Sequence, residues 1–277
     1  MGGKALVLGG GGYTAEGWEA GILAGLAEAG VDLTDADLVV GTSAGAILGA
    51  RVASGTPPAE LFAQPPARRG EEPAVEVPFP VVLRFLWAAL VSRTPEAAAR
   101  RLGRVAPAAR TVSEEEALAA MRAMLPVRDW PDRPLHVAAA DAHTGEVTAF
   151  HSGSGVGLLR AVTAGGTLPG VWPPLDIGGR RWVDGGVRST TNADLARGHR
   201  RIAVLAPVPG GPGVPAARHA AELRAGGARV VLLTPDAAAR RAFGRDALDP
   251  ARREAAARAG RAQAAACARA VAEVWLG

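Results

Sequence analysis

The chain has 277 residues, of which 48% are hydrophobic and 21% charged, so it can bury one sizeable core and is not a disordered protein. Its single cysteine, Cys267, excludes an internal disulfide and a cysteine-rich zinc site, because both need at least two thiols. A formal net charge of +4 favours mild attraction to anionic surfaces, and we expect no binding of nucleic acid.

The first residues do not have the pattern of a signal peptide. Their apolar run, residues 5–8, stops at four glycines instead of continuing. Elsewhere no apolar run approaches the roughly 18 to 20 residues of a membrane-spanning helix, and the best candidate, residues 75–91, contains Glu76 and Arg84. We therefore expect a cytoplasmic protein, whose contact with an anionic membrane would be peripheral.

Two strand–turn–helix units are predicted at the start of the chain. Residues 5–8 form a buried strand that runs into the glycines of residues 9–12, after which apolar residues recur at helical spacing. Residues 38–40 form a second short strand, and residues 44–53 a helix with many small side chains. Both glycine turns follow the carboxyl ends of predicted strands, where ligands bind in open α/β sheets.

Residues 57–125 are interpreted as a variable insertion or lid region. The first part is rich in proline and charge and should be loop. The apolar stretch 78–90 is either a lid or apolar contact surface or, more simply, an ordinary core helix. Ser113 and Glu116 resemble a capping box before a helix over residues 117–125.

Strands and helices alternate along the rest of the chain. Further strands are expected at residues 135–140, 147–150, 202–205 and 230–233. Residues 250–277 form a long arginine-rich helix, which could face anionic lipid or be only solvated. This alternation predicts an α/β fold, with a central, mostly parallel sheet flanked by helices in three layers, in a single domain over residues 1–277.

Residues 41–45, Gly-Thr-Ser-Ala-Gly, match the pattern G-x-S-x-G between an apolar strand and a helix. The flanking Gly41 and Gly45 give the room that a sharp strand-to-helix turn requires, so Ser43 would project its hydroxyl from the apex. The following helix N-terminus would offer unpaired N–H groups and the positive end of its dipole to a developing oxyanion. Ser43 is the candidate nucleophile.

The glycine loop after the first strand allows two interpretations. Gly10, Gly11 and Gly12 could bring successive backbone N–H groups close to a substrate oxygen and form an oxyanion hole. The same glycines, with Ala15 and an acidic residue about twenty positions on (Asp32 or Asp35), also fit a degenerate dinucleotide-binding fingerprint.

A serine nucleophile needs a general base. Asp184, at a predicted strand end and followed by Gly185 and Gly186, is the candidate, although Asp-Gly-Gly alone is often just a turn. The chain order Ser43, Asp184, then His199 or His219 would also permit a full Ser-Asp-His triad.

The motifs at residues 9–12, 41–45 and 184–186 stand in the order shown by patatin-like phospholipases, and residues 163–174 and 183–194 also match. The chain therefore resembles that family of acyl hydrolases over about residues 4–235. The resemblance implies the three-layer patatin-like fold and a lipid or other ester substrate. It further implies a Ser-Asp dyad without histidine, which maps onto Ser43 and Asp184, with Gly10, Gly11 and Gly12 as the oxyanion hole.

Two departures from the family pattern affect the site. The family usually places an arginine just after its glycines, whereas Gly12 is followed here by Tyr13-Thr14-Ala15-Glu16. Gly165 and Gly166 stand where relatives more often carry serine or cysteine. Rate and specificity are therefore expected to differ from the family norm.

Three questions stay open at the level of sequence. The first is whether a dyad or a triad performs the chemistry, and the second is whether the chain is instead a non-enzymatic nucleotide-binding or interaction protein. The third is the substrate, because phospholipids, neutral lipids and simple esters all present the same carbonyl to Ser43. No metal or cofactor is expected, since the histidines lack metal-ligand spacing and no calcium-binding loop is visible.

Overall fold

The computed structural model describes residues 3–63, 91–92, 94, 97–98, 100–102, 112–211 and 213–277. Most of the predicted insertion over residues 57–125 lies outside these residues. The apolar stretch 78–90, interpreted as a lid or a core helix, lies wholly outside them. The domain limits 1–277 stay a prediction.

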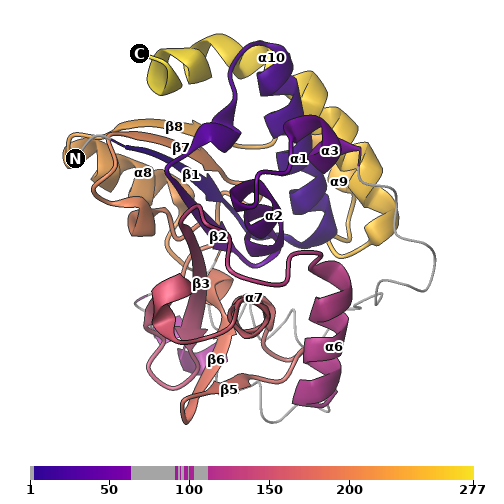
Figure 1. Ribbon diagram of the computed structural model, residues 1–277, viewed down its shortest axis with the longest axis vertical. Coiled ribbons are helices and arrows are strands. Elements are labelled where there is room, and N and C mark those ends of the chain that lie inside the picture. The colour runs from indigo at the N-terminus through magenta and orange to yellow at the C-terminus, as the bar shows by residue number, and fades with distance from the viewer. Residues whose placement is uncertain are drawn as a thin grey trace.

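A mixed, mostly parallel sheet forms the centre of the molecule (Figure 1). Its strands are β1 (Lys4–Leu8), β2 (Leu38–Thr42), β3 (Leu135–Asp141), β4 (Val147–Phe150), β5 (Leu175–Ile177), β6 (Arg180–Asp184), β7 (Arg201–Leu205) and β8 (Arg229–Leu233). They are ordered β5-β6-β3-β2-β1-β7-β8, and β4 pairs with β3. The pairs among β3, β2, β1, β7 and β8 are parallel, whereas β4, β5 and β6 pair antiparallel.

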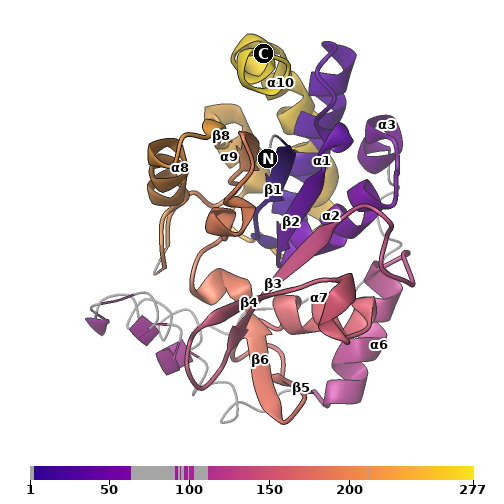
Figure 2. The same cartoon turned by 60° about the vertical axis from the view of Figure 1, so that its left-hand side comes forward.

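Helices cover both faces of this sheet (Figure 2). Leu6 and Leu8 of β1 point into a core shared with helices α1 (Gly12–Glu28), α2 (Ala44–Ala53), α7 (Leu158–Gly166) and α10 (Arg253–Trp275). Ala5 and Val7 point to the other face, where α8 (Ala216–Ala225) and the short helix η5 (Ala193–Ala196) pack. Successive side chains of a strand point to opposite faces, so this double burial explains the continuous apolar runs of the parallel strands. The predicted fold class is confirmed.

Helix α1 packs beside α10 on one face of the sheet, and it also contacts α2 and α3. Every residue from Tyr13 to Leu26 is buried, so α1 has no polar face. Gly17, Gly21 and Gly25 lie one turn apart and face α10, where a Cβ on any of them would overlap main-chain or side-chain atoms of α10. These glycines therefore permit the close approach of the two helices.

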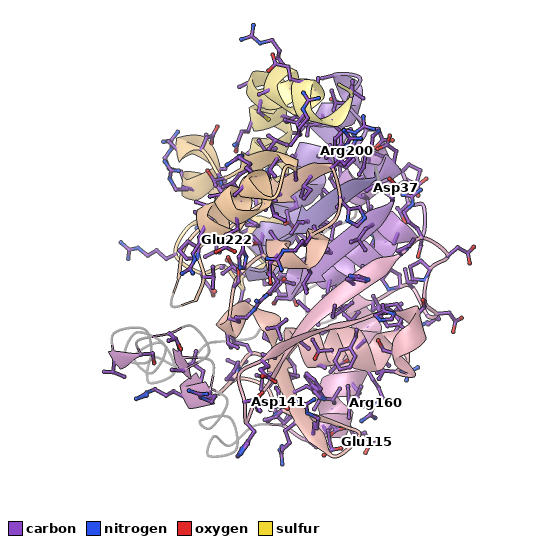
Figure 3. All side chains as sticks on the ribbon, turned by 90° about the vertical axis from the view of Figure 1, so that its left-hand side faces the viewer. Asp37, Glu115, Asp141, Arg160, Arg200 and Glu222 are labelled. Carbon is purple, nitrogen blue, oxygen red and sulfur yellow. The ribbon has the colours of Figure 1, made fainter. Side chains whose placement is uncertain are left out.

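The remaining helices are α3 (Pro58–Phe62), α6 (Glu114–Met124) and α9 (Ala237–Phe243). The capping box predicted for α6 is confirmed, because the Glu116 N–H donates to the Ser113 hydroxyl and the Ser113 N–H donates to the Glu116 carboxylate. Arg160 of α7 forms an ion pair with Glu114 of α6, at the edge of the molecule where Glu115 also lies (Figure 3). Helices α7, α8 and α9 were not predicted from sequence. The expectation of loop at the start of the proline-rich segment was wrong for α3, whose Pro58 stands in the first turn, where proline is compatible with a helix. Among the described residues no helix combines the length and apolarity that crossing a membrane requires.

Candidate active site

Ser43 lies at the turn that joins β2 to α2. Its backbone has φ 55° and ψ −124°, a region that residues with a side chain rarely adopt and that costs on the order of 1 to 3 kcal/mol. A Cβ at Gly41 would overlap Ala46, and one at Gly45 would overlap the carbonyls of Leu8 and Gly9. The motif glycines are thus required by packing, and the strained strand-to-helix turn predicted for Ser43 is present.

The glycine loop lies directly beside Ser43. A Cβ at Gly10 would come within 2.9 Å of the Ser43 Cβ, so only glycine allows this approach. Gly11 and Gly12 have φ values of 143° and 70°, which favour glycine. The Gly10 N–H donates to the Thr190 carbonyl at 2.8 Å. Within the described residues no hydrogen-bond acceptor is assigned to the N–H groups of Gly11 and Gly12.

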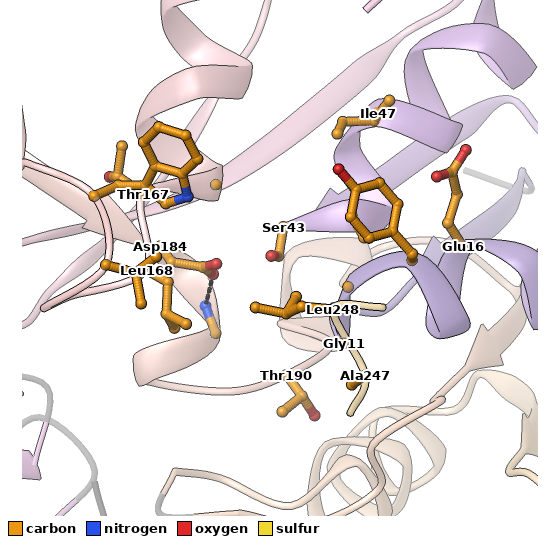
Figure 4. Close-up of a pocket in the computed structure, with 18 of the residues that line it drawn as sticks. Gly11, Glu16, Ser43, Ile47, Thr167, Leu168, Asp184, Thr190, Ala247 and Leu248 are labelled. Atoms are coloured by element: carbon orange, nitrogen blue, oxygen red, sulfur yellow. Dashed lines mark hydrogen bonds between the residues drawn. The ribbon is translucent and has the colours of Figure 1, made fainter. Parts of the chain in front are cut away.

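Asp184 ends β6 and is 3% exposed. Its Oδ1 accepts a hydrogen bond from the Gly186 N–H at 2.7 Å, drawn as a dashed line in Figure 4. Burial raises the pKa of Asp184 to about 6, and the Gly186 amide and the Ser43 hydroxyl, as hydrogen-bond donors, oppose that rise. Asp184 is therefore ionised at neutral pH and is a stronger base than an exposed aspartate.

One cavity of about 410 Å³ contains both side chains (Figure 4). The three glycines of the loop, Gly10, Gly11 and Gly12, line it together with Gly186. Its walls are mainly apolar and come from five parts of the chain: Ile47, Met121, Met124, Leu168, Val171, Trp172, Val208 and Leu248. A mostly apolar pocket with a small set of placed polar groups is typical of a ligand-binding site.

The histidines proposed for a triad lie elsewhere. His199 contacts the Ala196 carbonyl at 3.1 Å and packs near Gly3, at the amino ends of the strands. Asp37 and Arg200, which directly precede β2 and β7, mark that end of the sheet in Figure 3. His219 lies 3.5 Å from both Asp194 and the Ser189 hydroxyl. Neither His199 nor His219 lines the cavity.

The acidic residues of the dinucleotide fingerprint are also displaced from the glycine loop. Asp32 caps a short helix through the Thr34 N–H, and Asp35 pairs with Lys4 and accepts from the Trp275 indole. Both precede β2 and so lie at its amino end, whereas a ribose-binding carboxylate belongs at the carboxyl end of that strand. The geometry therefore does not bring the fingerprint together.

Two buried glutamates of α1 support the site and were missed at the level of sequence. Glu19 is fully buried and its Oε1 accepts from the Gly9 N–H at 2.7 Å, and burial raises its pKa well above the usual value. Glu16 lines the cavity and lies 3.3 Å from Arg253 and 3.9 Å from Arg51. The signal was available, because an apolar helix without a polar face must bury any acid that it carries.

A third missed feature is a buried polar cluster next to Asp184. Asn192 is fully buried with φ 45°, and its side chain donates to Thr42, the last residue of β2, and to Gly185, which follows β6. Arg188 and Asp194 complete the cluster through paired hydrogen bonds. The segment 183–194 matched the family pattern, but its spacing alone did not assign a task to Asn192.

A serine on a strained turn after a parallel strand, with a buried carboxylate in the same pocket, is an arrangement of serine hydrolases on α/β folds. Residues 6–197 match the family described as patatin-like phospholipase. The match covers more than half of the chain, which therefore belongs to the patatin-like phospholipase family of lipid acyl hydrolases. The resemblance inferred from the sequence motifs is confirmed.

Two solved structures are similar to the chain. VipD from Legionella pneumophila is 14% identical with a TM-score of 0.47, over 97% of this chain and 67% of that one. The type III effector protein ExoU is 14% identical with a TM-score of 0.39, over 96% of this chain and 53% of that one. This chain thus spans only part of the length of each. Comparison with curated protein sequences gives no match.

The described residues contain no group of three or more His, Cys, Asp or Glu side chains arranged to hold a metal ion. The predicted site residues instead meet around one pocket or directly beside it: Ser43, Asp184 and the glycines Gly10, Gly11, Gly12, Gly41, Gly45, Gly185 and Gly186. The chemistry that these groups offer is a hydroxyl, a carboxylate and backbone amides.

Proposed function

We propose that the chain hydrolyses carboxylic ester bonds of lipids, with Ser43 as nucleophile and Asp184 as general base. The observation that carries the proposal is that one apolar cavity holds both side chains, the serine on a strained turn and the carboxylate buried. Among the described residues that line this cavity there is no histidine, which favours the dyad over the triad.

In the first half-reaction the Ser43 Oγ attacks the ester carbonyl carbon while Asp184 takes the hydroxyl proton. The carbonyl oxygen becomes an oxyanion, which the N–H groups of Gly11 and Gly12 stabilise because no acceptor within the described residues occupies them. Gly10 contributes space instead of a donor, since its N–H is bonded to Thr190. Collapse breaks the bond to the alcohol, which leaves with the proton from Asp184, and an acyl-enzyme remains.

In the second half-reaction Asp184 takes a proton from water, whose oxygen attacks the acyl carbon. The tetrahedral intermediate then releases the fatty acid, and the proton returns to the Ser43 oxygen. A carboxylate whose pKa is about 6 serves both directions better than an ordinary aspartate, because it is ionised at pH 7 yet closer to the serine in basicity.

The test is hydrolysis of p-nitrophenyl esters of increasing chain length by wild type and by Ser43→Ala, Asp184→Asn, His199→Ala and His219→Ala, with folding checked by circular dichroism. We expect loss of turnover in the first two variants and retention in both histidine variants. A dead histidine variant that still folds would replace the dyad with a triad. A wild type that hydrolyses no ester but binds a nucleotide tightly would favour the non-enzymatic alternative.

Peripheral contact with an anionic membrane stays a separate proposal. Arg258 and Arg261 of α10 already pair with Glu254 and Glu28, so they present little unbalanced positive charge. Flotation with anionic and with zwitterionic liposomes tests this point, and equal binding to both would remove any role for charge.

A further inference from the structure

The side chain of Asn192 joins the two halves of the proposed dyad. Its Nδ2 group donates to the Thr42 hydroxyl at 3.1 Å, to the Gly185 carbonyl at 3.1 Å and to the Ser189 carbonyl at 2.7 Å. Thr42 directly precedes Ser43, and Gly185 directly follows Asp184. An amide nitrogen carries two hydrogens, so three acceptors at these distances share them.

The orientation of this amide is fixed by Arg188. The Asn192 Oδ1 accepts from Arg188 Nε at 3.0 Å and from Nη2 at 2.7 Å. Arginine only donates, so the oxygen of Asn192 must face it and the nitrogen must face Thr42 and Gly185. Arg188 is held in turn by Asp194, through Nη1 at 2.9 Å and Nη2 at 2.7 Å.

The backbone of Asn192 contributes to the same arrangement. Its left-handed conformation, φ 45° and ψ 40°, is one that asparagine tolerates better than most residues. It is fully buried, so its polar atoms have no access to water. Both the strain and the burial are offset by the five hydrogen bonds of the side chain.

No direct pairing between strands links Ser43 to Asp184. β2 and β6 are not hydrogen-bonded to each other, because β3 lies between them in the sheet order. Ser43 and Asp184 also lie at the ends of the regular ladders, at turns that the sheet constrains only on one side. A proton transfer between them requires a separation held to a fraction of an ångström.

We propose that Asn192 is a positioning residue, which sets the separation of Ser43 and Asp184 by binding Thr42 and Gly185 at once. It touches neither the substrate nor the reacting atoms. This inference rests on the proposed function of Ser43 and Asp184, and it assigns the link between them to one side-chain amide.

The test uses Thr42, because Asn192→Ala removes every hydrogen bond of the buried amide at once. Thr42→Val keeps the shape of a buried strand residue and removes only the acceptor for Asn192. We expect kcat to fall about tenfold with KM within about twofold, and Thr42→Ser to restore kcat to near the wild-type value. Asn192→Ala should lower kcat by about 10²-fold. Adding Thr42→Val to Asn192→Ala should lower kcat little further, because Asn192→Ala has already removed the hydrogen bond between the two side chains.

The matched control is Thr191→Val. Thr191 is also fully buried, and its hydroxyl has no hydrogen-bond partner in the described part of the chain. We expect this variant to keep the wild-type kcat. An equal loss of kcat in Thr191→Val and Thr42→Val would overturn the proposal, and so would full additivity of Thr42→Val and Asn192→Ala.

Failure of the proposed function is recognised separately. Turnover that survives Ser43→Ala, or a wild type without ester turnover, removes the dyad chemistry. The positioning proposal is then judged from crystal structures of wild type and Thr42→Val, in which it requires the distance between Ser43 and Asp184 to change. An unchanged distance overturns it.

Discussion

In the proposed mechanism the carboxylate of Asp184 is the general base, and its burial carries an energetic cost. Because burial raises its pKa to about 6, the folded state holds a proton that the unfolded state has already released between pH 4 and pH 6. The proposed role of general base needs the ionised form, whereas the buried environment of the folded state favours the protonated form. Two opposite pH dependences follow from one residue.

For activity, we expect kcat/KM to rise through pH 6 and to level off above pH 7. An aspartate with the ordinary pKa would instead place the midpoint near pH 4. The measurement is a pH profile of ester hydrolysis on the wild type, with folding monitored at each pH. A midpoint near pH 4 would mean that burial does not raise the pKa of Asp184.

For stability, the sign is reversed. An acid whose folded-state pKa is raised destabilises the fold as pH increases from about 4 to about 6, by on the order of 3 kcal/mol. We expect Asp184→Asn, which keeps the acceptor for Gly186, to raise Tm at pH 8 and to leave it nearly unchanged at pH 4. Thermal unfolding at both pH values measures this, and an equal shift at the two would contradict it.

Glu16 and Glu19 lie one turn apart in α1 and are expected to respond differently to the same substitution. Burial raises the pKa of Glu19 well above its usual value and so favours the neutral form that Gln resembles, so Glu19→Gln should leave stability within about 1 kcal/mol of wild type. Glu16 lies between Arg51 and Arg253, so Glu16→Gln removes a buried charge partner and should cost about 3 kcal/mol or more. The free energy of unfolding in urea, measured for both variants and wild type at pH 7, tests these two expectations.

At the scale of elements, the pairing of α1 with α10 depends on glycine. Helix propensity alone favours Gly21→Ala by about 1 kcal/mol. A Cβ there would overlap the Ala257 carbonyl, so we expect the variant to lose at least about 2 kcal/mol of stability. Gly157→Ala is the control, because Gly157 has φ −66° and an added methyl group would meet no atom within 4 Å. Because Gly157 is the N-cap of α7, where alanine is less favourable than glycine, chemical denaturation should find this control destabilised by no more than about 1 kcal/mol.

Elements with strong local signals were predictable. The apolar strands β1, β2, β7 and β8, the capping box of α6 and the C-terminal helix all follow from periodicity and end signals. Helix α7 was missed because its small residues, Ala164, Gly165 and Gly166, were interpreted through the family pattern and not as a helix. Pairing order could not be predicted, because it depends on contacts between segments far apart in sequence.

The site was predictable to the extent that its chemistry is local. Ser43 and its two motif glycines follow from the steric needs of one turn. The hydrogen bond that occupies the Gly10 N–H was not foreseeable, because its acceptor, Thr190, is 180 positions away. The hydrogen bonds of Glu19 and Asn192 could not be foreseen either, because the burial of these side chains and their bonding partners are set only by the folded structure.

At the scale of the whole molecule, the segment beyond the family match is part of the same core. The match ends at residue 197, yet β7 pairs with β1 along its full length in the centre of the sheet. Helix α10 covers α1, and its Trp275 indole donates to the Asp32 carbonyl at 2.9 Å and to Asp35 at 2.8 Å. Without residues 198–277, one edge of β1 and one side of α1 would face water.

We therefore expect the chain to unfold as one cooperative unit, and a chain ending at residue 197 not to fold. The exposed edge of β1 would lose its ladder, and the apolar α1 would lose the partner that its glycines fit. A chain ending at residue 275 is the matched control, because it removes only Leu276, which is 55% exposed, and Gly277. Calorimetry of the full chain should give one transition, and circular dichroism should separate the two truncations. A folded, monomeric 1–197 chain would show instead that the proposed catalytic residues belong to an independent domain, with β7, β8 and α10 added to it.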